Sequence, residues 1–398
     1  MPLIAYLWIA FALNYVDRQM VYSMFPALQA DLGFAGAKLG LIGSVFMWVY
    51  TLSMPIAGRL ADLWRKDLLI VSSLVLWSAA TLGCGMATSE SGFLLWRGLM
   101  GITEALYYPA ALALIASHYD ESQRSRVLGL HQSAMYAGVL LGGWYGGWAA
   151  DHTGWRQGFT IAAAIGLSYS FVLWYGVRTS AVNAATPITR SDSSISELTR
   201  SPRFLALSLA FAAFCAIQWV VLAWYPSFLQ ERFHLSMTDS GWNATAFVQI
   251  SQLVGIFAGS TLADHFRKRF PPARLYVAAA GVLLSAPFAY WTFASLSLNE
   301  ARFFSAGFGL FSGLLASNAF AAAYDVIGSQ NRGLGGGVLN MMGGLSSAVM
   351  IYMAGIWKLT IGLDGVVLRL MAVSLVSAIL LAVIATKEKD QPKLVSFQ

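Results

Sequence analysis

The chain has 398 residues, of which 57% are hydrophobic and only 11% are charged. An ordinary soluble domain has about 25% charged residues, so this composition excludes a soluble enzyme, a disordered protein and a nucleic-acid binder. The net charge of +6 is spread along an apolar chain and is not a nucleic-acid-binding surface. Cys84 and Cys215 both lie in apolar stretches, which predicts neither a disulfide framework nor a metal cluster. We therefore expect an all-α membrane protein.

Apolar runs long enough to cross a bilayer follow one another along the chain. A helix needs about 20 apolar residues to span the hydrocarbon core, and no run alternates as a barrel strand would. The first run is not a cleavable signal, because it lacks a basic segment and carries Asn14, Asp17 and Arg18 in its middle. Twelve spans are predicted, at roughly 3–27, 38–60, 68–87, 92–116, 127–149, 158–178, 203–229, 241–263, 274–295, 301–325, 333–357 and 364–386.

Lys and Arg are distributed unequally between the two sides of these spans. With both termini inside, 17 of the 25 fall in inner loops, 6 fall outside, and Arg18 and Arg97 lie within spans. Positive residues collect in cytoplasmic loops, so both termini are expected in the cytoplasm. The short loops favour a multi-pass protein of a bacterial inner membrane, with the lipid bilayer as its surroundings, and we expect a monomer.

A polar segment divides the chain into two halves. Residues 179–200 contain nine Ser or Thr and no aromatic residue, which is typical of a flexible cytoplasmic linker. The predicted domains are an N-terminal six-helix bundle at 1–178, the linker at 179–200 and a C-terminal six-helix bundle at 201–398. LADLWRK at 60–66 recurs as LADHFRK at 262–268. This repeat indicates a duplication with a cavity between the halves, near the membrane midplane.

The loop after the second span reads GRLADLWRK from Gly58 to Lys66. It resembles the signature G-x-x-x-D-[RK]-x-G-[RK] of the major facilitator superfamily, from which Leu63 and Arg65 depart, and the resemblance extends over the whole chain. It implies the fold of that superfamily, in which the signature acid caps a helix and bonds across the halves in the outward-open state. The implied conformational gating residues are Gly58, Asp62, Lys66, Asp264 and Arg267.

Four ionisable side chains fall inside predicted spans: Asp17 and Arg18 in the first, and Arg97 and Glu104 in the fourth. Each costs roughly 2.5–3.5 kcal/mol at the bilayer centre and usually marks a transport path, with two structural ion pairs as the alternative. Arginine keeps its proton, so only the two acids titrate. With both acids protonated the site is doubly positive and suits an anion; when both release protons, the arginines regain internal partners. This dependence of the site's charge on protonation predicts that an anion moves together with protons.

Two motifs carry a second resemblance. Residues 14–18 read NYVDR, and residues 97–104 read R-x-x-x-G-x-x-E. Both resemble motifs of the anion:cation symporter family, which includes sugar-acid carriers. The resemblance implies that Arg18 binds the substrate carboxylate and that Asp17 and Glu104 carry the coupling protons. Other substrate-binding positions in or near matching family positions are Asn14, Tyr15, Tyr50, Arg97 and Asn340.

Further polar residues are candidates for the same site. Tyr108 shares a helix face with Arg97, Gly101 and Glu104, so that Gly101 is expected to open space between the two charges. His131 and Gln132 on the fifth span are candidates to bond substrate hydroxyls, with packing as the equal alternative for His131. No Gly-Lys-Ser/Thr phosphate loop occurs, so ATP-driven transport is not expected, and neither is a cofactor or a metal.

Two functions stay open, because the spinster family of lipid transporters shares the same four charges. The first is a proton-coupled symporter that imports a small organic anion by rocking of the two halves. The second is a spinster-like proton-coupled exporter of a lysolipid or another amphiphile. A receptor or a membrane-embedded enzyme is disfavoured, since the centres of the spans contain no nucleophile–base pair or metal triad.

Overall fold

The computed structural model describes residues 3–34, 36–180, 195–270, 272–328 and 331–386. Within these ranges all regular secondary structure is helical. The helices are α1 (Leu3–Ser23), α2 (Phe25–Leu32), α3 (Ala37–Leu63), α4 (Lys66–Met86), α5 (Glu90–Ala105), α6 (Tyr107–His118), α7 (Glu121–His152), α8 (Trp155–Ser180), α9 (Ile195–Arg200), α10 (Pro202–Phe233), α11 (Met237–Arg267), α12 (Ala273–Ala294), α13 (Leu298–Val326) and α14 (Arg332–Thr386).

The helices account for the predicted spans. Among the described residues, nine helices are long and apolar enough to cross a membrane, with α5 and α6 counted together. One of the nine, α14, has non-helical backbone at Gly362 (φ 72°, ψ 167°) and is therefore two helical segments. α1 and α7 are outside the nine, and the polar residues within each lower its apolar character. With these two helices and the division of α14, the described chain matches the twelve predicted spans.

Two of the predicted spans contain a break in the helix, although the fourth still lies within one apolar stretch from Glu90 to His118. The first span ends before Met24, and α2 then begins with Pro26 in its first turn. The fourth is divided at Leu106 into α5 and α6. Pro109 explains this break, because it has no N–H to donate to the carbonyl of Ala105 four residues earlier.

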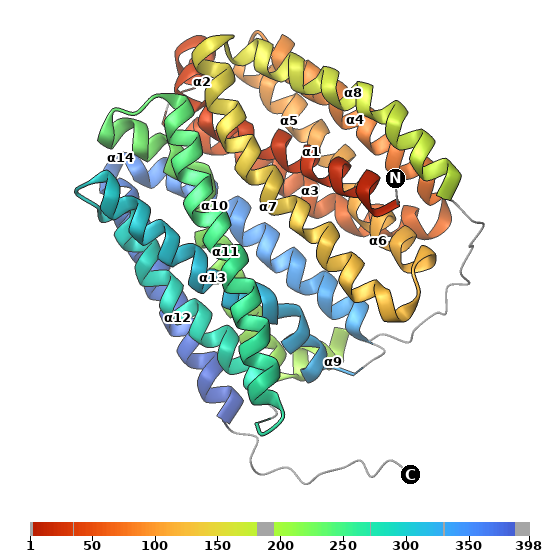
Figure 1. Cartoon of the computed structure of the whole chain (residues 1–398). Coiled ribbons are helices and arrows are strands. Elements are labelled where there is room, and N and C mark those ends of the chain that lie inside the picture. The colour runs from red at the N-terminus through yellow and green to blue at the C-terminus, as the bar shows by residue number, and fades with distance from the viewer. Residues whose placement is uncertain (1–2, 35, 181–194, 271, 329–330, 387–398) are drawn as a thin grey trace.

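The helices before and after the linker form two groups that meet along α7 and α11 and along α3 and α14. Figure 1 shows α7 and α11 side by side at one end and separating towards the end that carries α9. Residues 181–194 of the predicted linker lie outside the described residues. The domain boundaries at 179–200 therefore stay a prediction.

Glycines allow α7 to approach two helices at once. A Cβ atom at Gly142 would lie 2.8 Å from the carbonyl oxygen of Val16 in α1. A Cβ atom at the next residue, Gly143, would lie 2.9 Å from the carbonyl oxygen of Gly241 in α11. Small residues at helix interfaces are the usual means of such close backbone contact in membranes. These glycines of α7 hold α1, which carries the charged residues, next to the place where α7 meets α11.

Hydrogen bonds between the two groups gather at the end of the molecule away from α9. Gln19 Nε2 in α1 donates to the carbonyl of Leu222 in α10 at 3.0 Å. Ser44 Oγ in α3 donates to the carbonyl of Ala348 in α14 at 2.7 Å. The conformation is therefore one in which this end is closed.

Candidate functional site

A buried ion pair joins α1 to α5. Arg18 Nε lies 2.6 Å from Glu104 Oε2, and the two side chains are 4% and 0% exposed. Charge-assisted hydrogen bonds of this length are the strong ones, and removing one partner leaves a buried charge uncompensated. The pair links the two stretches of sequence that carry the charged motifs.

Three aromatic rings surround the guanidinium of Arg18. Its Cζ lies 4.1 Å from the ring centroid of Tyr50, 4.7 Å from that of Tyr15 and 5.1 Å from that of Phe46. Cations over aromatic faces at these distances are attracted by the ring quadrupole. Gly101 makes this frame possible by facing α3, since a Cβ there would lie 2.7 Å from the carbonyl oxygen of Phe46. The expectation that Gly101 opens space between the charges was therefore wrong.

Arg97 is fully buried and has no carboxylate partner in the part of the chain that the structure describes. Its Nε donates to the carbonyl of Ile42 at 3.3 Å, and its Nη1 lies 3.4 Å from Met100 Sδ. Nη2 has no hydrogen-bond partner, and Cζ lies 4.8 Å from the ring centroid of Phe46. A purely structural role of the four charges would predict two buried ion pairs. The described residues form one of them, between Arg18 and Glu104.

The other two polar residues of the first motif are also buried. Asp17 is 4% exposed, and its Oδ2 accepts a hydrogen bond of 3.4 Å from Thr81 Oγ1 in α4. Asn14 is 1% exposed, and its amide lies near the Glu104 carboxylate without completing a hydrogen bond of normal geometry. Unpaired buried polar groups are costly, which makes this part of α1 a functional candidate.

His131 and Tyr108 lie in an aromatic cluster beside the site. The His131 ring is fully buried, stacks on Phe11 at 4.5 Å between centroids, and lies 3.2 Å from the Tyr107 hydroxyl through Nε2. Tyr108 stacks on Phe11 at 5.6 Å, and Phe11 contacts Tyr15 edge-on. This arrangement favours the packing interpretation of His131.

The remaining predicted substrate residues are not joined to the four charges by any contact that the described residues show. Gln132 on α7 has a buried amide oxygen without a hydrogen-bond partner. Asn340 on α14 is exposed. Their roles stay predictions.

The predicted gating residues behave differently in the two halves. Asp264 pairs with Arg274 at 3.2 Å, and Asp325 pairs with both Arg274 and Arg267 at 3.1 and 3.0 Å. Asp62 is exposed and makes no hydrogen bond or ion pair in the described part of the chain. Lys66, by contrast, has a partner, and a Cβ at Gly58 would meet nothing within 4 Å. The second-half acid is thus held in its own half in this conformation.

Phe46 and Thr81 were missed by the sequence reasoning. Phe46 faces both arginines, and Thr81 is the hydrogen-bond donor to Asp17. The signal for Phe46 was its position four residues before Tyr50, which places both rings on one face of α3. Thr81 gave no signal, because one hydroxyl in an apolar span is unremarkable. The described residues contain no group of three side chains that could hold a metal ion.

The family model of the Major Facilitator Superfamily matches residues 7–351. The chain belongs to the Major Facilitator Superfamily. It is a secondary transporter and a multi-pass membrane protein, and not an enzyme.

The proteins similar to this transporter include spinster homologues and a D-galactonate transporter. Protein spinster homolog 1 of Homo sapiens is 29% identical over 305 residues, which cover 71% of this chain and 58% of the human protein. The match therefore spans less than two thirds of that relative. The D-galactonate transporter of Escherichia coli is 24% identical over 406 residues, covering 94% of this chain and 92% of that protein.

A solved structure shows the same fold. The transporter matches the crystal structure of a bacterial homologue of the human lysosomal transporter spinster in an inward-facing, unoccupied conformation, with a TM-score of 0.79 and 19% identity. The match covers 96% of this chain and 95% of the other. The predicted major facilitator fold is thereby confirmed.

Proposed function

We propose that this transporter couples protons to the import of a small organic anion, such as a sugar acid, by alternating access. The observation that carries the proposal is the buried pair of Arg18 and Glu104. Arg18 is the carboxylate-binding cation, and Asp17 and Glu104 are the proton carriers. Both termini lie in the cytoplasm, so the closed end described above faces outwards.

The ion pair supplies the coupling rule. Among the described residues Arg18 has one carboxylate partner, and that partner is itself titratable. When Glu104 takes up a proton, the guanidinium loses its counter-charge in a buried site and is free to bind a carboxylate through two parallel N–H groups. When the proton leaves, Glu104 competes for Arg18 and releases the anion. Proton uptake and anion binding therefore favour each other.

The aromatic frame prepares Arg18 for this exchange of partners. The rings of Tyr15 and Tyr50 lie against the guanidinium, which orients its plane. A planar donor that is already oriented loses less freedom on binding. Arg97 adds a second buried positive charge near Phe46, which suits an anion and disfavours a cation as substrate.

The full-length similarity to a D-galactonate transporter supports a sugar acid. The second candidate is a spinster-like proton-coupled exporter of a lysolipid, and the 29% identity to a spinster homologue favours it. The test is transport by the purified protein in liposomes with an imposed pH gradient, using labelled D-galactonate and labelled lysophosphatidylcholine. We expect D-galactonate to accumulate and a protonophore to abolish that accumulation. Movement of the lysolipid without any uptake of D-galactonate would reverse the choice.

Arg18→Lys tests the binding residue itself. Lysine keeps the charge but replaces a planar two-donor group by a point charge, so the affinity for D-galactonate should fall about 10- to 150-fold, as expected for loss of a hydrogen bond to a charged group. Titration calorimetry measures it, and Arg302→Lys is the control, since Arg302 bonds Asn243 far from the site. Unchanged affinity in Arg18→Lys would remove Arg18 from the binding role.

A further inference from the structure

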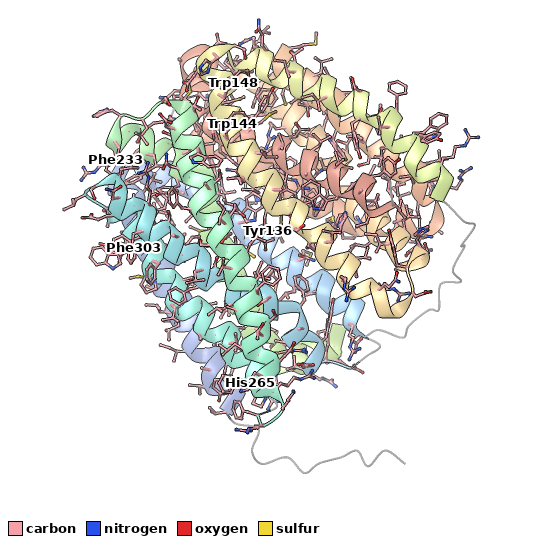
Figure 2. The ribbon with its side chains drawn as sticks, viewed as in Figure 1. Tyr136, Trp144, Trp148, Phe233, His265 and Phe303 are labelled. Carbon is pink, nitrogen blue, oxygen red and sulfur yellow. The ribbon has the colours of Figure 1, made fainter. Side chains whose placement is uncertain are left out.

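A cavity of about 200 Å³ lies between α1, α7 and α8, on the opposite side of α1 from the ion pair's aromatic frame. Its outer wall is formed by Leu141, Trp144 and Ile165, which are 48%, 40% and 48% exposed. Figure 2 labels Trp144 on α7, on the same helix as Trp148 near the closed end. In a multi-pass membrane protein, exposed apolar side chains of spanning helices face lipid, so the cavity opens towards the bilayer.

The floor of this cavity is the carboxyl-bearing residue Asp17. The side chain is 4% exposed, and it accepts a hydrogen bond from Thr81 in α4. The Tyr145 hydroxyl, the other polar group of the lining, already donates to the carbonyl of Gly158 at 2.8 Å. The other lining side chains, from Leu13, Val16, Leu141, Trp144, Ala162 and Ile165, are apolar or aromatic, so most of the cavity wall offers no hydrogen-bond partner to water. The cavity is suited to hydrocarbon.

We propose that the cavity is a lipid-tail site, in which the end of one acyl chain of a bilayer lipid inserts between α7 and α8 and rests against Asp17. The size agrees, because an apolar cavity of about 150 Å³ in another protein stays dry and binds benzene. Lipid is the occupant because the exposed rim belongs to the lipid-facing surface of the protein. The acyl chain covers Asp17 from the membrane side and keeps protons from reaching this acid through the cavity. The site does not depend on which substrate is carried.

The test uses the full chain in vesicles of phosphatidylcholine and phosphatidylglycerol that contain a phosphatidylcholine with a diazirine at the end of one acyl chain. On irradiation the diazirine loses N₂ and the resulting carbene inserts into a carboxyl O–H to give an ester. We expect mass spectrometry to find the lipid ester on Asp17, which lipids that contact only the outer surface cannot reach. An identical lipid with the diazirine in its headgroup should leave Asp17 unmodified.

Two substitutions on one helix form a matched pair. Ala162→Phe fills the cavity and should abolish the Asp17 adduct, whereas Ala164→Phe, at an exposed position of α8 outside the lining, should preserve it. Ile165→Ala widens the mouth and should increase the adduct, which keeps the test decisive if Ala162→Phe does not fold. The proposal is overturned if Asp17 is unmodified while α7 and α8 surface residues are labelled. It is equally overturned if both phenylalanine variants behave alike, or if the headgroup probe labels Asp17.

Discussion

Asp151, near the end of α7, caps the first turn of α11 through Thr238. Its Oδ2 accepts hydrogen bonds from the N–H of Thr238 at 2.8 Å and from the Thr238 hydroxyl at 2.7 Å. Its Oδ1 accepts the N–H of Met237 at 3.3 Å. A negative charge at a helix N-terminus is favourable, and here the acid and the helix belong to different halves of the transporter. The contact therefore joins the two halves at the end that is closed in this structure.

Asp151→Ala should shift the transporter towards the conformation that is open at this end. Removing a favourable negative charge from a helix N-terminus costs about 0.3–2 kcal/mol, so the population ratio should change about 2- to 30-fold. Spin labels at Thr153 and His234 measure the change as an increased fraction of long distances. Glu300→Gln is the control, because Glu300 bonds Leu296 within one half. An equal shift in both variants would contradict a role specific to the contact between halves.

Gly143→Leu should prevent closure of the same end. A Cβ at Gly143 would lie 2.9 Å from the Gly241 carbonyl, so a leucine separates α7 from α11. Cyclic transport should be lost, while thiol labelling of a cysteine at Ser240 from that side should increase. Gly129→Leu on the same helix is the matched control, since a Cβ there meets nothing within 4 Å. Normal transport by Gly143→Leu would show that the close approach is dispensable.

Glu104→Gln should separate exchange from accumulation. Glutamine resembles the protonated acid permanently, so Arg18 stays available and counterflow of D-galactonate should persist. Uptake driven by a pH gradient should vanish, because no proton is released to reset the carrier. Liposome assays compare the two modes, and Glu90→Gln, whose carboxylate pairs with Lys38 at a distance from the site, serves as control. Accumulation by Glu104→Gln in response to the gradient would exclude Glu104 as the coupling acid.

Asp62→Asn and Asp264→Asn should change the conformational balance and leave ligand selectivity unchanged. Asp264 is held by Arg274 in this conformation, whereas Asp62 has no partner in the described part of the chain. Asp62→Asn should therefore weaken only the opposite conformation, in which the end near α9 closes. Cysteine accessibility on both sides measures the balance. Loss of binding in every conformation would place these acids in the site instead.

The sequence predicted the number of spans and the burial of the four charges, because apolar length and the cost of charge in a bilayer are properties of single segments. It did not predict that Arg18 chooses Glu104 over Asp17, its own neighbour in the chain. That choice depends on the approach of α5 to α1, which rests on contacts across several helices. The exposure of Asn340 and the cap at Asp151 were missed for the same reason: each depends on which end of the molecule is closed.

The ion pair between α1 and α5 has a consequence for how the transporter is made. Arg18 and Glu104 are separated by 86 positions in the chain, and α1 is not among the described helices that are apolar enough to cross a membrane unaided. At about 5–20 residues per second of synthesis, the partner of Arg18 leaves the ribosome about 4–17 seconds after it. During that interval Glu104 is not yet available to Arg18, so the charge of α1 has to be accommodated without the partner that it has in the folded transporter.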